Sequence, residues 1–163
     1  MMKKYINAIV IILGVILIDQ LSKLFIQRSM ELGDSIKVIE DLFYITSHRN
    51  SGAAWGMLEG QMIFFYIMTV IVLGLLVYLF MYEAHSRLMQ YGIALIIGGA
   101  IGNFIDRVLY QHVIDFIDVY IGTYDFPIFN VADSALTIGV ILLFIHMMKD
   151  FISDKKEQKM KTK

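Results

Sequence analysis

Four apolar segments, each about as long as a membrane is thick, dominate this chain of 163 residues. A helix needs roughly 20 apolar residues to cross the hydrocarbon core of a bilayer. The run 62–82 supplies 21 residues without a single charge, and the run 5–26 supplies 22, with charges only near its end. We therefore predict one integral membrane domain, an all-α fold of four transmembrane helices at about 5–26, 62–82, 88–107 and 131–149.

Composition agrees with this prediction and removes several kinds of chemistry. Hydrophobic residues make up 58% of the chain, more than the roughly 45–50% of soluble domains. There is no cysteine, which excludes disulfides, thiolate nucleophiles and cysteine metal sites. The four histidines fall in separate segments without a His-Glu-x-x-His motif. We expect no metal, no cofactor and no nucleic-acid partner.

The charges predict how the chain crosses the membrane. Lys3 and Lys4 precede an apolar run without a small-x-small cleavage site, so we interpret this run as a retained span rather than a cleaved signal peptide. With four spans, the side that carries both termini has nine lysines and arginines, against five on the other side. The positive-inside rule then predicts cytoplasmic termini. Eleven of the acidic residues, and nearly all candidate catalytic groups, fall on the outer side.

Two polar excursions separate the spans on that outer side. The segment 30–57 contains two runs rich in β-branched and aromatic residues, 36–39 and 42–46, between turn-forming residues. We predict a small extracytoplasmic β-rich element between the first and second helices. Its end, 52–56, combines small residues with one aromatic, which suits close backbone approach or the bilayer interface. The lysine-rich tail 150–163 is interpreted as a cytoplasmic anchor or a contact for anionic headgroups.

Polar side chains gather where the four spans reach the outer face. The candidate residues are Asp19, Lys23, Asn50, Asn103, Asp106, Arg107, Asp115, Asp118, Asn130 and Asp133. A carboxylate at membrane depth is costly, so an acid there indicates function by default. Asp115 and Asp133 are flanked by apolar residues, and two carboxylates that meet suggest acid–base chemistry on a shared proton.

The same residues also allow structural interpretations. Asn130 and Asp133 have the spacing of a helix cap with a reciprocal bond from the third helical position. Capping does not exclude catalysis, because a helix N-terminus also holds a carboxylate rigidly. Asp115, between Ile114 and Phe116, has no obvious capping role.

Simple pairing would explain several other members of the group. Asp19 and Lys23 have the i,i+4 spacing of a helix salt bridge, and Asp106 with Arg107 would form an interfacial charge pair. Asn103 would form hydrogen bonds between two transmembrane helices. The remaining acids of the second excursion are interpreted as solvated loop residues: Asp118 and Asp125.

Five blocks, in this order, resemble bacterial lipoprotein signal peptidase (signal peptidase II). They are Asp19–Lys23, Asn50–Gly56, Gly98–Arg107, Val113–Phe116 and Phe126–Ser134. The length and the four-span arrangement are also similar across nearly the whole chain. One mild departure is Trp55, where the family pattern leads us to expect phenylalanine.

The resemblance implies an aspartic endopeptidase of the bacterial plasma membrane that cleaves prolipoproteins just before their diacylglyceryl-modified cysteine. It places the catalytic pair at Asp115 and Asp133. It also implies blockage by the cyclic peptide globomycin. The supporting polar residues that it implies are Asp19, Asn50, Asn103, Asp106, Arg107 and Asn130.

The positions of these residues suggest further roles within the site that the resemblance implies. Asn103 and Arg107, one turn apart, are expected to hold the substrate backbone, and Asn130 to support the pair. The segment Asn50–Gly56 is expected to close over the substrate. We expect a monomer, because one site per chain needs no partner. A coupled pair titrates as a unit, so either aspartate can be the base.

Two other classes of membrane protein remain open on the residues alone. A small transporter or proton relay would also carry intramembrane Asp, Asn and Arg residues. Such proteins often show inverted repeats, and this sequence has no convincing repeat. A structural scaffold is the third interpretation, and the outer polar group argues against it.

Overall fold

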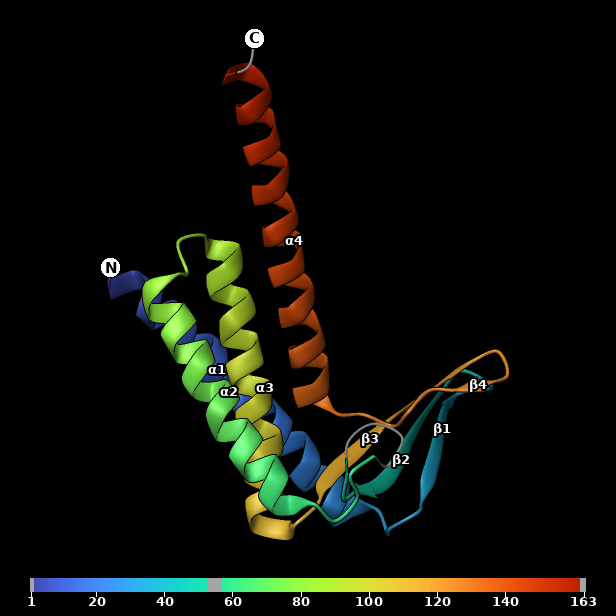
Figure 1. Cartoon of the computed structure of the whole chain (residues 1–163). Helices are drawn as coiled ribbons and strands as arrows, with labels where there is room; N and C mark the ends of the chain where they lie inside the picture. The colour runs from blue at the N-terminus through green and yellow to red at the C-terminus, as the bar shows by residue number, and fades with distance from the viewer. Residues whose placement is uncertain (1, 53–56, 162–163) are drawn as a thin grey trace.

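The computed structural model describes residues 2–52 and 57–161 and shows four long helices standing beside a small sheet (Figure 1). The helices are α1 (Met2–Ser29), α2 (Met62–Tyr82), α3 (Arg87–Tyr110) and α4 (Val131–Lys161). All four are long and apolar enough to cross a membrane. The chain is therefore a multi-pass membrane protein, as the apolar runs predict. The sequence stretch 53–56, which includes Trp55, lies outside the described residues.

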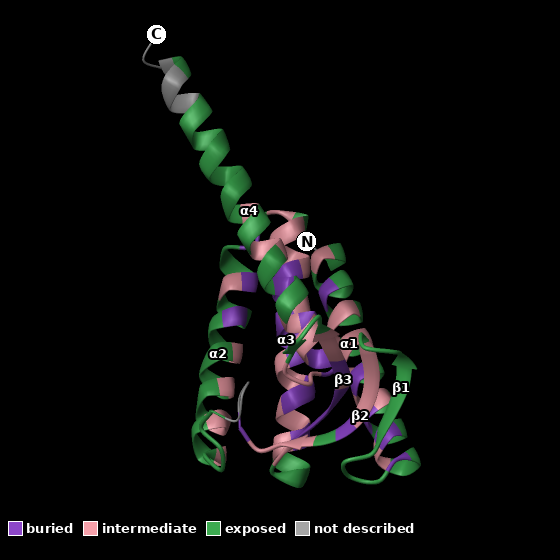
Figure 2. Ribbon diagram, turned by 90° about the vertical axis from the view of Figure 1, so that its right-hand side faces the viewer, coloured by how far each residue is buried: buried purple, intermediate pink, exposed green. Residues whose placement is uncertain are grey.

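The bundle is organised around α3, which is the most buried helix (Figure 2). Half of the most apolar 18-residue stretch of α3 is buried inside the protein, whereas only 11–17% of the corresponding stretches of the other three helices is buried. Glycines permit this close packing. A Cβ at Gly98 would lie 2.9 Å from Cβ of Val15 in α1, and one at Gly99 would collide with the Ala132 carbonyl oxygen in α4. Small residues thus let backbones approach where no hydrophobic effect drives helices together.

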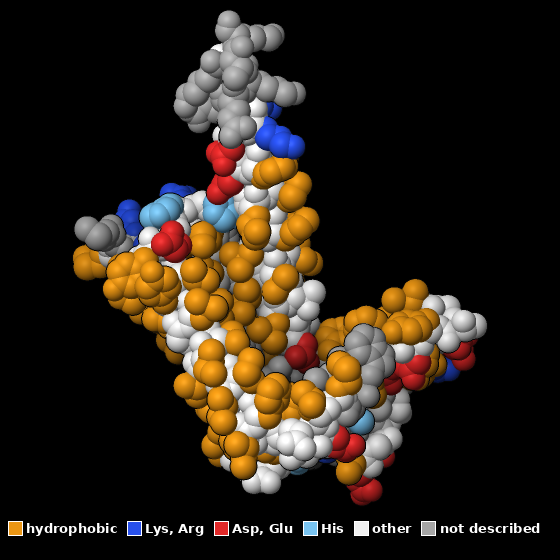
Figure 3. Space-filling view, in the orientation of Figure 1, with side chains coloured by type: hydrophobic (Ala, Val, Ile, Leu, Met, Phe, Trp, Pro, Cys, Tyr) orange, Lys and Arg blue, Asp and Glu red, His pale blue; other side chains and the backbone are white. Residues whose placement is uncertain are grey.

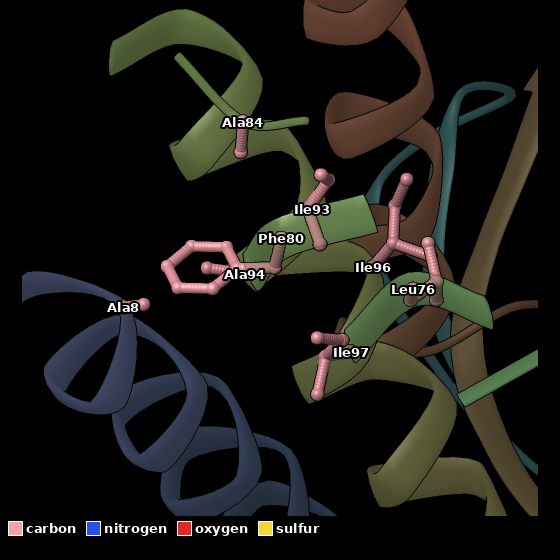
Figure 4. Packing of buried hydrophobic residues seen from close by; sticks show 8 residues of the cluster. All are labelled: Ala8, Leu76, Phe80, Ala84, Ile93, Ala94, Ile96 and Ile97. Atoms are coloured by element: carbon pink, nitrogen blue, oxygen red, sulfur yellow. The ribbon is translucent and has the colours of Figure 1, made fainter. Parts of the chain in front are cut away.

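A cluster of apolar side chains holds α1, α2 and α3 together (Figure 4). Phe80 of α2 packs in it with Ala8 of α1 and Ala94 of α3. Tyr5 adds an edge-to-face contact to Phe80, with the ring centroids 5.9 Å apart. The full cluster consists of Ala8, Leu76, Phe80, Ala84, Ile93, Ala94, Ile96 and Ile97.

The sheet unites the two polar excursions at one end of the bundle. Its antiparallel strands run in the order β1 (Ser35–Ile39), β2 (Phe43–Asn50), β3 (Val113–Ile121) and β4 (Tyr124–Asp125). The β-rich element predicted between the first two helices is confirmed as β1 and β2. The second excursion, interpreted above as a loop, instead supplies β3, the longest strand.

Asp118 is buried because it lies on β3. It lies on that strand opposite Tyr44, is only 4% exposed, and accepts a hydrogen bond of 2.6 Å from the Thr46 hydroxyl. The prediction that it is solvated is therefore wrong, because strand pairing buries it. Asp125, by contrast, is exposed on β4 as predicted.

Candidate active site

Asp115 and Asp133 line the same cleft, although they come from different kinds of element. Asp115 lies on β3 opposite His48, and Asp133 lies in the first turn of α4. The cleft has a volume of about 930 Å³ and lies where the sheet meets the helix bundle. Figure 3 shows the hollow there, with acidic atoms between the lower end of α4 and the sheet. Asp115 is 1% exposed and Asp133 is half-buried.

The start of α4 fixes Asp133 by a reciprocal cap. The Asp133 amide donates to Oδ1 of Asn130 at 2.9 Å, and the Asn130 amide donates to Oδ2 of Asp133 at 3.2 Å. The predicted capping arrangement is therefore confirmed. Oδ1 of Asp133 accepts a further bond of 2.7 Å from the Asn103 side-chain amide. The carboxylate is thus oriented from two helices, which limits its rotation.

Asp115 is held by amide groups on both oxygens. Nδ2 of Asn130 donates to its Oδ1 at 2.7 Å, and Nδ2 of Asn50 donates to its Oδ2 at 3.0 Å. Asn130 therefore contacts both carboxylates, capping α4 with one aspartate and donating to the other. A single residue thus connects the pair, through its side chain to the Asp115 carboxylate and through its backbone amide to the Asp133 carboxylate.

The setting of Asp115 changes its acidity. Burial raises the pKa of the Asp115 carboxyl to about 6, and the negative charge of Asp133 acts in the same direction. The hydrogen bonds from Asn50 and Asn130 lower the pKa of Asp115 and so oppose part of this rise. Near neutral pH such a carboxyl exchanges its proton readily, as acid–base catalysis requires.

A buried lysine lies beneath the pair. Nζ of Lys23 is 2.8 Å from Oδ2 of Asp19, 2.9 Å from Oδ2 of Asp106 and 3.0 Å from Oδ1 of Asn103. The predicted Asp19–Lys23 pair is confirmed. The predicted Asp106–Arg107 pair is wrong, because Asp106 points to Lys23 on α1 instead. The pattern of one sequence segment cannot reveal a partner on another helix.

Asp19 and Asp106, which contact Lys23, also accept hydrogen bonds from the backbone beside Asp133 and Asp115. Oδ1 of Asp19 accepts from the amide of Ala132, next to Asp133, at 2.9 Å. Oδ2 of Asp106 accepts from the amide of Ile114, next to Asp115, at 3.1 Å. Asp19 and Asp106 therefore brace the segments that carry the pair.

The sequence predicted only a salt bridge for Lys23 and no contact for Gln20. Nε2 of Gln20 donates to Oδ1 of Asp106 at 2.9 Å and to the Gly102 carbonyl at 3.2 Å. Both residues belong to the block Asp19–Lys23, which is the one signal that pointed to them.

Asn103 and Arg107 differ in what they leave free. Asn103 is 6% exposed, and its contacts with Lys23, Asn130 and Asp133 hold its side chain in place beside the Asp133 carboxylate. Arg107 lies over the Phe65 ring at 4.6 Å and donates through Nη2 to the Gly52 carbonyl at 3.3 Å. Its buried Nε finds no partner within the described residues. Arg107 also lines the cleft.

The cleft combines this polar floor with an apolar wall. The wall consists of the segment 126–129, just before α4, and Ile138, two turns further along α4. Across residues 2–52 and 57–161, no group of three or more His, Asp or Glu side chains is arranged to hold a metal ion. The arrangement suits a water molecule between two carboxylates, with an extended and partly apolar ligand along the cleft.

Known proteins that are similar to this chain belong to one family. The family model described as signal peptidase (SPase) II matches residues 11–149. A lipoprotein signal peptidase of Geobacillus thermodenitrificans (strain NG80-2) is 58% identical over 135 residues, covering 82% of this chain and 84% of that protein. A lipoprotein signal peptidase of Staphylococcus aureus (strain MRSA252) is 54% identical over 164 residues, covering 99% and 100%.

Two solved structures share the fold. A bacterial membrane enzyme determined by the in meso method at 2.3 Å superposes with a TM-score of 0.85 and 53% identity, covering 89% of each chain. A second, at 1.9 Å, gives a TM-score of 0.82 and 54% identity, covering 88% of this chain and 94% of the other.

Proposed function

Because the chain belongs to the signal peptidase II family, we propose that Asp115 and Asp133 are the carboxylates with which it hydrolyses its substrate. As a member of this family, the protein is a membrane aspartic endopeptidase that removes the signal peptide of diacylglyceryl-modified prolipoproteins, just before the lipidated cysteine. The observation that carries the proposal is the contact of Asn130 with both carboxylates, which line the same cleft.

The pair works with one proton between its two carboxyl groups. The ionised carboxylate takes a proton from water as the water oxygen attacks the scissile carbonyl carbon, and the protonated carboxyl donates to the carbonyl oxygen. The tetrahedral intermediate then collapses and the carbon–nitrogen bond breaks. The leaving amine takes the proton that the base had gained, and a hydroxyl proton of the intermediate returns to the carboxylate that had acted as the acid, so the pair again holds one proton. The raised pKa of Asp115 keeps a proton available for this exchange. The pair titrates as a unit, so both assignments of acid and base fit.

The surrounding residues position the reactants. Asn50, Asn103 and Asn130 orient the two carboxylates, and Asp19 and Asp106 hold the adjacent backbone. Arg107, which lines the cleft, binds carbonyl groups of the extended substrate beside the pair. The apolar wall at 126–129 takes the acyl chains of the substrate, whose burial there contributes about 0.8 kcal/mol for each methylene group.

Charge and shape support one orientation in the membrane. Both termini lie at the end of the bundle away from the sheet (Figure 1). The excess of lysine and arginine on the terminal side supports cytoplasmic termini. The cleft and the sheet then lie at the extracytoplasmic face of the plasma membrane, where prolipoproteins present their cleavage site. The cleft is built within one chain, so a monomer suffices, and globomycin would inhibit by filling it.

Replacement of each aspartate tests the proposal. Asp115→Asn and Asp133→Asn should each lower the rate of cleavage of a lipidated prolipoprotein by roughly 100-fold to 10,000-fold, the range for a lost acid–base group. Binding of the uncleaved substrate to each variant shows that the cleft has formed. Asp41→Asn is the matched control, because Asp41 is exposed in the β1–β2 turn. Either variant that binds and cleaves at the native rate would exclude its aspartate from the pair.

A further inference from the structure

The last turns of α4 project past the other helices with their charges sorted by side. α4 has 31 residues, which at 1.5 Å per residue makes a rod of roughly 46 Å. The hydrocarbon core of a bilayer is only about 30 Å thick. The helix therefore continues beyond the membrane on the side that carries the termini, as its upper end in Figure 1 illustrates.

One side of this projecting segment is acidic and is turned toward the bundle. His146, Asp150 and Asp154 follow one another at intervals of four residues and so share a line along the helix. Nε2 of His146 is 3.4 Å from Oδ2 of Asp150, and its Nδ1 is 3.4 Å from the hydroxyl of Ser86 at the start of α3. These contacts fix the rotation of α4 about its own axis.

The opposite side carries three lysines and two apolar side chains, which we call the basic face: Lys149, Phe151, Ile152, Lys155 and Lys156. At about 100° per residue these five positions span roughly 160° of the helix circumference, and Asp150 and Asp154 lie outside that arc. All five side chains are exposed, and Nζ of Lys155 lies 4.4 Å from the centre of the Phe151 ring. Figure 3 shows the same division, with red atoms on the bundle side of the helix and orange and blue atoms opposite.

The depth of the basic face matches the headgroup layer. With Val131 at one hydrocarbon boundary, the 20 residues that span about 30 Å end at Asp150. The polar layer adds roughly 6 Å on each side, or about four further residues. Lys149, Phe151 and Ile152 thus lie at its inner edge, and Lys155 and Lys156 lie at its outer edge.

We propose that the basic face of α4 binds anionic phospholipid headgroups of the membrane leaflet on the side of the termini. The three ammonium groups pair with phosphate oxygens, while Phe151 and Ile152 reach toward the acyl chains. The acidic line is kept away from these headgroups by the contact of His146 with Ser86. This surface lies at the opposite end of α4 from the cleft, so its function is lipid recognition rather than hydrolysis.

Two neighbouring methionines allow the local lipid to be measured, because the chain contains no cysteine. Met148 lies at the centre of the basic face, and Met147, at nearly the same depth, points outside it; both are exposed. Met148→Cys and Met147→Cys would each carry a fluorophore in the full chain, reconstituted in mixed phosphatidylglycerol and phosphatidylcholine vesicles. Quenching by spin-labelled versions of each lipid then reports which headgroup is adjacent.

The proposal predicts preferential quenching by phosphatidylglycerol at position 148 and little preference at 147. One lysine near an anionic surface contributes roughly a fivefold preference for the anionic lipid over the neutral one. The double variant Lys155→Gln with Lys156→Gln should therefore reduce the preference for phosphatidylglycerol at position 148 by up to about 25-fold. Adding Asp150→Asn and Asp154→Asn restores the native net charge but not the basic face, so the preference should stay low. Equal quenching at both positions, an unchanged preference without the two lysines, or its recovery in the fourfold variant would each overturn the proposal.

Discussion

Replacement of Lys23 by methionine should destabilise the protein strongly, because this lysine compensates two buried carboxylates. Methionine keeps much of the apolar stem but removes the ammonium group. That group lies within 3.0 Å of oxygens of Asp19, Asp106 and Asn103, and it is 1% exposed. Asp19 and Asp106 are 0% and 1% exposed, so solvent does not screen the carboxylate charges that would lose their partner.

The size of the effect follows from burial. Removing one partner of a buried ion pair leaves an uncompensated charge and typically costs about 3–5 kcal/mol. For a protein of this length, that corresponds to a drop in the thermal unfolding midpoint on the order of 10 °C. Cleavage should also slow, because Lys23 holds the Asn103 oxygen and thereby directs the Asn103 amide toward Asp133.

Thermal unfolding in detergent, followed by circular dichroism, measures the effect. Lys37→Met is the matched control, because Lys37 pairs with Glu40 at 2.8 Å but both side chains are more than half exposed. Such surface pairs contribute about 0–1 kcal/mol. The double variant Lys23→Met with Asp106→Asn should recover part of the loss, since it removes one uncompensated charge. Our reasoning is refuted if Lys23→Met unfolds like the control, or if the double variant is no more stable than the single one.

Three further predictions concern the carboxylate pair and the helix packing. The pKa of Asp115 is raised to about 6, so the pair loses its shared proton above that pH. The value of kcat/KM for cleavage should therefore fall on the alkaline side. A flat pH profile from about pH 5 to 8 would contradict the shared proton. Asn50→Ala removes a hydrogen bond that lowers the pKa of Asp115, so this alkaline limb should move to higher pH, and movement to lower pH would contradict the assignment. Gly99→Ala should lower the free energy of unfolding by roughly 1–3 kcal/mol, because the new Cβ would collide with the Ala132 carbonyl oxygen. Gly74→Ala is the control and should be neutral or stabilising, because a Cβ there has nothing within 4 Å. Equal stabilities of the two variants would contradict the close fit of α3 against α4.

Local patterns predicted much of the fold. The apolar runs define the four spans because a bilayer demands length and hydrophobicity from each segment separately. The Asn130–Asp133 cap and the Asp19–Lys23 pair could also be predicted from the sequence, because both depend on spacing within one helix.

The missing parts depend on contacts between distant segments. Strand β3 contains two aspartates, which favoured a loop in the sequence, and only its pairing with β2 shows why Asp115 and Asp118 are buried. Asp106 pairs with Lys23 because α1 and α3 pack in one particular register, which no single segment encodes. The double role of Asn130 likewise requires the start of α4 to lie against β3. The resemblance placed these residues in one site, and the tertiary contacts explain what each does there.

The central claim is that Asp115 and Asp133 act together on the scissile bond, and a structure of the substrate complex tests it most directly. The Asp115→Asn variant, bound to an intact diacylglyceryl-modified prolipoprotein, holds the substrate before cleavage. We predict that the carbonyl just before the lipidated cysteine lies between side chains 115 and 133, within about 3 Å of one of them or of a water molecule that both contact. A carbonyl bound elsewhere in the cleft, with neither side chain in reach, would contradict the account.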